Sequence, residues 1–159
     1  MFSIEDIVNL AVKIEKNAEK TFREAATKVA NPSLVSLLHW LADEESKHAE
    51  WFSEFHKKLD RAVDDPKLEE IGKAILQSAL DDQVFSLKDV DFSNIDQIAD
   101  LLRKTIEFEN DTILFYEMIR SFLEDEETSV HLNTIIEEEK GHIRLLEEFL
   151  DSGAEAGPK

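Results

Sequence analysis

Two short segments decide the fold, Glu45-Ser46-Lys47-His48 and Glu139-Lys140-Gly141-His142, which share a Glu-x-x-His spacing. They lie 94 residues apart, and each follows a further glutamate, Glu15 or Glu109, by 30 residues. Residues three apart on a helix share one face, so each Glu-x-x-His pair can approach one metal ion together. Four carboxylates and two imidazoles suit two ions of iron, manganese or zinc.

The two isolated glutamates fall on the apolar faces of the helices that we predict around them. Glu15 lies in a segment whose neighbours one turn away are apolar, and Glu109 lies between Ile106 and Ile113. An inward charge is costly unless it is paired or bound to a metal, and four carboxylates in one layer would repel each other. Two divalent cations would relieve that repulsion. The alternative is a set of surface salt bridges with a hydrogen-bonded pair of core histidines.

Composition restricts the other possibilities. The chain has 159 residues, enough for one domain, and only four glycines and three prolines, which favours long helices. Its formal net charge of −18 argues against a nucleic-acid partner, because the sequence has no basic patch that could neutralise phosphates. The chain has no cysteine, which excludes disulfides and thiolate-ligated metals and is compatible with the cytoplasm, where we expect the protein. Neither a signal peptide nor a membrane-spanning apolar run is visible, so we expect no membrane association.

Apolar residues at spacings of three and four predict an all-α chain with four long helices. Two antiparallel hairpins, joined by a long crossover over residues 62–92 with a short helix at 66–80, would form one four-helix bundle in residues 1–150. Residues 151–159 are expected to form a flexible tail. The first helix should span 4–29, the second 32–61, the third should follow Ser93 and the fourth should end near 150. The expected N-caps are Ser3, Asn31, Ser93 and Asp125.

Several residues near the repeat have weaker signals. Tyr116 lies two turns from Glu109 on nearly the same face, so it is expected either to pack in the core or to hydrogen-bond a ligand carboxylate. Glu44 and Glu138 also repeat at 94 residues, but they point about 100° away from the ligands and should lie on solvated faces. The remaining histidines are expected at the surface or rim, and a phenylalanine stripe in the core. These are His39, His56 and His131, and Phe22, Phe52, Phe55, Phe108, Phe115 and Phe122.

The segments Leu41–Ala49 and Ile136–His142 resemble the second-helix and fourth-helix motifs of the ferritin-like di-iron carboxylate superfamily, most closely its rubrerythrin group. The resemblance covers about residues 4–150. It implies a ferritin-like bundle with two iron ions, for which manganese or zinc could substitute. By this resemblance Glu15 and Glu109 would be terminal ligands, Glu45 and Glu139 would bridge the metals, and His48 and His142 would each bind one metal.

The same resemblance implies an oxidoreductase that reduces peroxide or dioxygen. Two departures from the family pattern are visible: the chain lacks the cysteine-ligated rubredoxin module, and Thr112 stands where many members have an additional glutamate. Electrons would therefore come from a separate donor protein such as a rubredoxin. The alternatives are a non-catalytic iron-binding or storage protein and a bundle that keeps metal for stability alone. A homodimer is an open possibility.

Overall fold

Four long helices make up the fold, and the part of the chain that the structure describes contains no strand. This computed structural model describes residues 4–56, 70, 87, 90–121, 123 and 126–156. The helices are α1 (Ile4–Ala26), α2 (Pro32–His56), α4 (Ile95–Ser121) and α5 (Glu126–Ala156). The all-α prediction is therefore confirmed.

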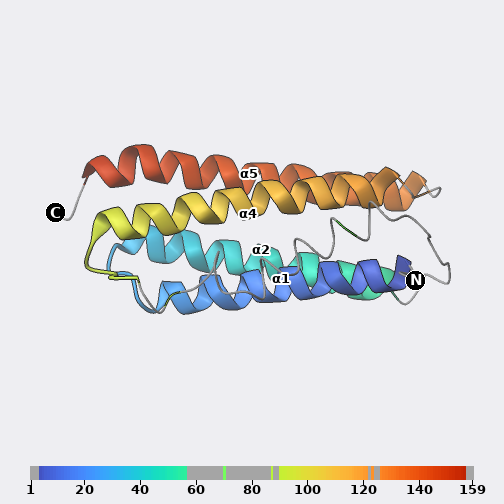
Figure 1. Cartoon of the computed structure of the whole chain (residues 1–159), viewed down its shortest axis with the longest axis horizontal. Helices are drawn as coiled ribbons and strands as arrows, with labels where there is room; N and C mark the ends of the chain where they lie inside the picture. The colour runs from blue at the N-terminus through green and yellow to red at the C-terminus, as the bar shows by residue number, and fades with distance from the viewer. Residues whose placement is uncertain are drawn as a thin grey trace.

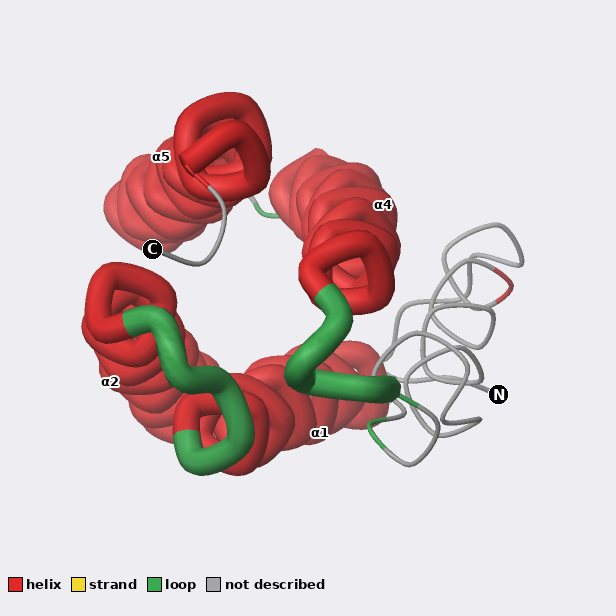
Figure 2. Tube along the Cα trace, turned by 90° about the vertical axis from the view of Figure 1, so that its left-hand side faces the viewer, coloured by secondary structure: helices red, strands yellow, loops and turns green. Residues whose placement is uncertain are grey.

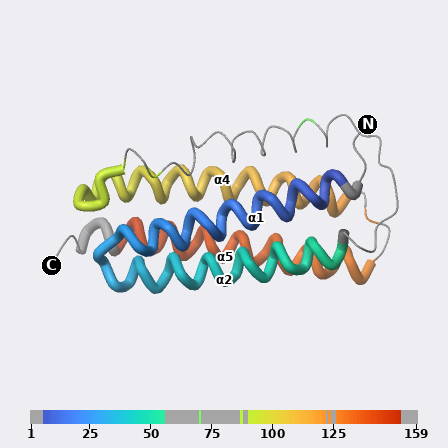
Figure 3. The backbone as a smooth tube through the Cα atoms, turned by 90° about the horizontal axis from the view of Figure 1, so that it is seen from below, coloured from blue at the N-terminus to red at the C-terminus, as the bar shows by residue number. Residues whose placement is uncertain are grey.

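The helices form two antiparallel hairpins, α1 with α2 and α4 with α5 (Figure 1). Seen along the bundle, α1 lies next to α2 and α4, while α5 closes the ring between α4 and α2 (Figure 2). Helices α2 and α4 run in the same direction, so α4 begins at the end of the bundle opposite to the one where α2 ends (Figure 3). This arrangement relates the hairpins by a pseudo-twofold axis across the bundle, as the 94-residue repeat predicts.

Asparagine side chains cap the N-termini of two helices, α2 and α4. Asn31 Oδ1 accepts hydrogen bonds from the backbone N–H groups of Ser33 (2.9 Å) and Leu34 (3.2 Å), which confirms the predicted cap of α2. The predicted cap at Ser93 is wrong. Asn94 Oδ1 accepts from Asp96 (2.9 Å) and Gln97 (3.3 Å), whereas the Ser93 hydroxyl donates to Asp91 (2.6 Å). Both residues are good caps, and the Asp91 contact holds Ser93 in the preceding turn.

Two helix ends differ from the prediction. Helix α1 ends at Ala26 rather than at 29, because its last turn tightens into three-residue hydrogen bonds from Thr27 to Glu24 and from Lys28 to Ala25 before the chain reverses. Helix α5 continues to Ala156, past the expected end near 150, since a single glycine at 153 costs a helix only about 1 kcal/mol. The predicted helix at 66–80, the end of the second helix, Ser3 and Asp125 lie outside the described residues.

The core consists of two apolar clusters on either side of the middle of the bundle. One contains Ile7, Ile14, Phe52, Phe115 and Ile136, and the other contains Phe22, Leu38, Leu41, Leu102 and Leu146. Apart from Phe122, which lies outside the described residues, the predicted phenylalanine stripe is buried. Burial on both sides holds the four helices in register at the layer between the clusters, where the polar residues lie.

Candidate metal centre

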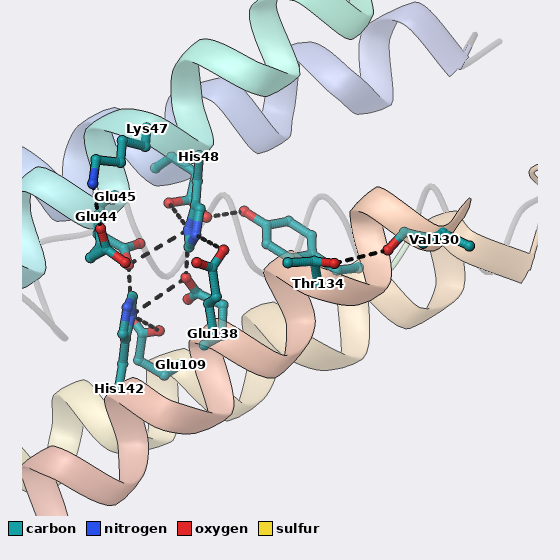
Figure 4. A network of polar contacts seen from close by, with 12 residues as sticks. Glu44, Glu45, Lys47, His48, Glu109, Val130, Thr134, Glu138 and His142 are labelled. Atoms are coloured by element: carbon teal, nitrogen blue, oxygen red, sulfur yellow. Dashed lines mark hydrogen bonds and ion pairs between the residues drawn. The ribbon is translucent and has the colours of Figure 1, made fainter. Parts of the chain in front are cut away.

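The six residues predicted as metal ligands meet in one buried layer. Helix α1 contributes Glu15, α2 contributes Glu45 and His48, α4 contributes Glu109, and α5 contributes Glu139 and His142 (Figure 4 shows the layer). Their exposed fractions lie between 0% and 4%. In the described part of the chain, they are all the buried acidic and histidine residues. Burying so many ionisable groups opposes folding unless something compensates their charge.

Each imidazole turns its Nδ1 atom toward a glutamate of the opposite hairpin. His48 Nδ1 lies 2.8 Å from Glu139 Oε1, nearer than the 3.9 Å that separates it from Glu45 Oε1 on its own helix. His142 Nδ1 correspondingly lies 2.9 Å from Glu45 Oε1 and 3.5 Å from Glu139 Oε1. The two rings stack at 5.8 Å between centroids with an angle of 19°. The two Nδ1 atoms therefore face the same space as the carboxylates.

The ligand atoms fall into two groups that could each hold one ion. The first contains Glu15, Glu45, His48 and Glu139, and the second contains Glu45, Glu109, Glu139 and His142. Within each group the atoms lie within 4.8 Å of one another, and Glu45 and Glu139 belong to both. A bridging ligand must reach both ions, and Glu45 and Glu139 can do so because each belongs to both groups.

Unsatisfied polar atoms show that the layer fits metal ions. Buried atoms without a hydrogen-bond partner are rare in native proteins. Here they gather in this layer: Glu15 Oε2, Glu45 Oε1, His48 Nδ1, Glu109 Oε2, both Glu139 oxygens and both His142 nitrogens. Carboxylate oxygens and imidazole nitrogens are ligands for iron, manganese and zinc. The layer is thus a cluster suited to binding metal ions.

In the metal-free layer, each buried carboxylate makes it harder for its neighbours to ionise. Burial raises the pKa of Glu45 well above its usual value, and the charges of Glu139, Glu15 and Glu109 raise it further. Burial and the neighbouring Glu139 likewise raise the pKa of Glu109. The raised pKa favours the protonated form of both carboxyls in the metal-free layer, and a bound cation would displace those protons.

The histidines respond to the same surroundings in opposite ways. Burial alone would lower the pKa of His48, but Glu15 and Glu139 outweigh it and raise the pKa to about 11. Burial alone would raise the pKa of Glu139, but the neighbouring Glu109 and His48 side chains outweigh it and hold the pKa below the usual range. Burial lowers the pKa of His142, and the charge of His48 adds to that effect. One imidazole thus carries the compensating positive charge when metal is absent.

A phenol and a hydroxyl border the layer. The Tyr116 hydroxyl donates a 2.5 Å hydrogen bond to Glu15 Oε1, one of the two roles predicted for this residue, while its ring packs in the core. Burial, followed by the charge of Glu15, raises the pKa of Tyr116 well above its usual value, so it stays a donor. Thr112 is buried as well, but its hydroxyl donates to the carbonyl of Phe108 at 2.9 Å and is thereby occupied.

Two residues that contact the layer were not predicted. Glu138 is 44% exposed, as a solvated face requires, yet its Oε1 lies 3.3 Å from His48 Nε2 (Figure 4). The 94-residue repeat of Glu44 and Glu138 could have pointed to this contact. The direction in which Glu138 leaves its helix did not show that its exposed side chain reaches across to the other hairpin. Trp40 is 45% exposed, and its ring meets that of His142 edge-on at 5.4 Å. No sequence pattern pointed to that contact.

Two other histidines, His39 and His131, are not part of this layer. His39 and His131 are exposed, which confirms their predicted surface positions. His131 stacks on Trp51 with ring centroids 4.4 Å apart and an angle of 7°. The side chain of His56 lies outside the described residues. Packing between α5 and α2 is therefore the visible role of His131.

Fold and site together define a four-helix bundle of the carboxylate–histidine type. The sequence model of the Rubrerythrin family matches residues 6–150, so the chain belongs to the rubrerythrin family. Its fold is similar to that of a candidate ferritin-like diiron-carboxylate protein from Thermotoga maritima, with a TM-score of 0.71 and 22% sequence identity. The alignment covers 96% of this chain and 97% of the other, and at that identity it supports the fold alone.

Among curated protein sequences, none matches this chain significantly. No helix in the described residues is long and apolar enough to cross a membrane.

Proposed function

We propose that the buried layer binds two iron ions and that the protein is an oxidoreductase that reduces peroxide or dioxygen. The supporting observation is the gathering of eight unpartnered buried polar atoms in two ligand groups that share Glu45 and Glu139. Glu15 and Glu109 would be terminal ligands, and His48 and His142 would each bind one ion through Nδ1. Manganese or zinc could occupy the same ligands.

The protein contributes orientation, charge and exclusion of water. Tyr116 orients Glu15 through its 2.5 Å hydrogen bond, and Glu138 orients the ring of His48. Such contacts from beyond the ligands hold them in place, and a carboxylate on the far nitrogen of a ligand histidine also raises the basicity of that histidine. The apolar clusters on both sides keep the layer away from bulk solvent. Two bound ferrous ions would supply the two electrons that, with two protons from solvent, convert hydrogen peroxide into two water molecules.

The electron donor and the oxidant are parts of the same proposal. The chain has no cysteine for an iron–sulfur centre of its own, so the donor would be a separate protein such as a rubredoxin. The protein would then cycle by accepting two electrons, one at a time, after each reduction of peroxide or dioxygen.

Stopped-flow oxidation of the anaerobically Fe(II)-loaded protein tests this function. We expect peroxide to oxidise the wild-type protein at least ten times faster than a Glu45→Ala/Glu139→Ala variant, because that variant lacks both shared ligands. A Glu50→Ala/Glu137→Ala variant is the matched control, since it removes two exposed glutamates from the same two helices. Equal rates for the wild-type protein and the ligand variant would contradict the proposal.

The experiment also separates an enzyme from an iron-storage protein. An enzyme should undergo repeated cycles when reduced rubredoxin and peroxide are both supplied. Iron that is bound and oxidised once, without further turnover, would favour iron binding or storage, and native mass would then show whether the chain forms a large shell.

A further inference from the structure

The 94-residue repeat lets the two ligand groups be compared position by position. It pairs Glu15 with Glu109, Glu45 with Glu139 and His48 with His142. It also pairs Glu44 with Glu138, Lys47 with Gly141 and Phe22 with Tyr116. The ligands themselves are identical in the two halves, so any difference between the two positions must come from the residues around them.

The imidazoles differ in what their Nε2 atoms contact. His48 Nε2 lies 3.3 Å from Glu138 Oε1, at hydrogen-bond distance, whereas the buried Nε2 of His142 has no partner. The pseudo-symmetric counterpart of Glu138 is Glu44. Glu44 Oε2 instead accepts a 3.0 Å hydrogen bond from Lys47 Nζ on the same helix, and the two side chains form an ion pair (Figure 4). The other half has Gly141 at the position of Lys47, so no equivalent cation holds Glu138.

The two glutamates proposed as terminal ligands also differ, because among the described residues only the one in the His48 group accepts a hydrogen bond from a neighbouring hydroxyl. Glu15 Oε1 accepts the 2.5 Å hydrogen bond from Tyr116. The counterpart of Tyr116 is Phe22, which has no hydroxyl that could donate a hydrogen bond to Glu109. Both supporting contacts therefore belong to the group that contains His48, and both are missing from the group that contains His142.

We infer that the two metal positions are unequal: the position at His48 fills first, and Lys47 and Phe22 keep the position at His142 weaker. This inference rests on the proposed metal-binding function. A carboxylate on the far nitrogen of a ligand histidine fixes its tautomer and increases its basicity, and losing such a contact typically costs about 10–100-fold in metal affinity. The expected ratio of the two dissociation constants is accordingly about 10–100.

The first test uses zinc, which undergoes no redox change. Crystals grown with one equivalent of Zn(II) should show anomalous density at the His48 group and little at the His142 group. Titration against a chromophoric chelator should give two dissociation constants in the stated ratio. Equal affinities, or first occupancy at His142, would overturn the inference. Binding of no ion at all would instead overturn the proposed function itself.

Two variants test the cause of the inequality. Lys47→Ala frees Glu44 to reach His142 and should tighten the weaker site about tenfold, while Glu138→Gln should weaken the tighter site by a similar factor. Lys47 is 74% exposed, so its removal should leave the fold intact. Lys140→Ala is the matched control because it breaks an exposed 3.2 Å pair with Glu137 on α5. If Lys47→Ala changes the affinities no more than Lys140→Ala does, the assignment to Lys47 is wrong.

Discussion

Tyr116 on α4 donates a 2.5 Å hydrogen bond to Glu15 on α1, a residue of the other hairpin that lies 101 positions earlier in the chain. Both side chains are fully buried. The contact joins the two hairpins next to the ligand layer, and Phe52 of α2 packs on the phenol with ring centroids 5.0 Å apart. It therefore couples bundle assembly to the orientation of a ligand carboxylate.

Replacing Tyr116 by phenylalanine should destabilise the metal-free protein. The substitution keeps the ring but leaves Glu15 Oε1 buried without a donor, which typically costs about 1–3 kcal/mol in the free energy of unfolding. Urea unfolding measures this loss. In a double-mutant cycle with Glu15→Gln, the two effects should be non-additive, because the residues are in direct contact. Additive effects would show that the hydrogen bond contributes nothing.

Metal binding should stabilise the fold. With Zn(II) at 100 times its dissociation constant, we expect each site to add about 2.7 kcal/mol to the free energy of unfolding. A Glu45→Gln/Glu139→Gln variant should lose that gain while remaining folded without metal, because it removes two carboxylates from a crowded buried layer. Thermal unfolding with and without Zn(II), and again after a chelator, measures both effects. An equal gain in the variant would be evidence against these ligands.

Stability of the metal-free protein should fall as pH rises from 7 to 9. The folded-state pKa of Glu45 and of Glu109 lies well above the unfolded value of 4.5, and that of His48 rises from 6.5 to about 11. Between pH 7 and 9 the folded protein keeps the His48 proton that the unfolded chain releases, so the stability that this proton contributes is lost as the pH rises. The raised pKa of Glu45 and of Glu109 acts in the same direction. Each such group contributes up to about 1.4 kcal/mol per pH unit.

The groups with lowered pKa do not reverse this trend. Glu139 is deprotonated above pH 7 in both the folded and the unfolded protein, and His142 is mostly deprotonated in both, so the two groups add little slope there. Thermal unfolding of the metal-free protein at several pH values measures the trend, with the Zn(II)-loaded protein as control. A melting temperature that stays constant or rises between pH 7 and 9 would contradict the proposed charge state of the layer.

Loss of either asparagine cap should weaken its helix. Asn31→Ala and Asn94→Ala each remove a side-chain acceptor for two backbone N–H groups, which typically costs about 1 kcal/mol. Ser93→Ala should cost less, since the Ser93 hydroxyl bonds only to the exposed Asp91. Chemical denaturation of the three variants ranks them. A larger loss for Ser93→Ala than for Asn94→Ala would restore Ser93 as the cap.

Sequence patterns predicted well whatever depends on position along one helix. The buried face of α1 with Glu15, the Asn31-Pro32 start of α2 and the two Glu-x-x-His pairs all follow from helical periodicity and capping chemistry. The start of α4 was displaced by one residue because Ser93 and Asn94 are both competent caps. The end of α5 was misplaced because the helix continues through Gly153, a single glycine that costs a helix only about 1 kcal/mol.

By itself, the sequence determined the all-α class, the hairpin repeat and which six ionisable side chains face inward, because these follow from spacing along single helices. Only the tertiary structure decided the partners: His48 lies closer to Glu139 than to Glu45, Glu138 reaches His48, and Tyr116 bonds Glu15. Periodicity specifies the face on which a side chain lies. Which residue meets it across the bundle depends on the packing and register of four helices, to which residues distant in sequence contribute.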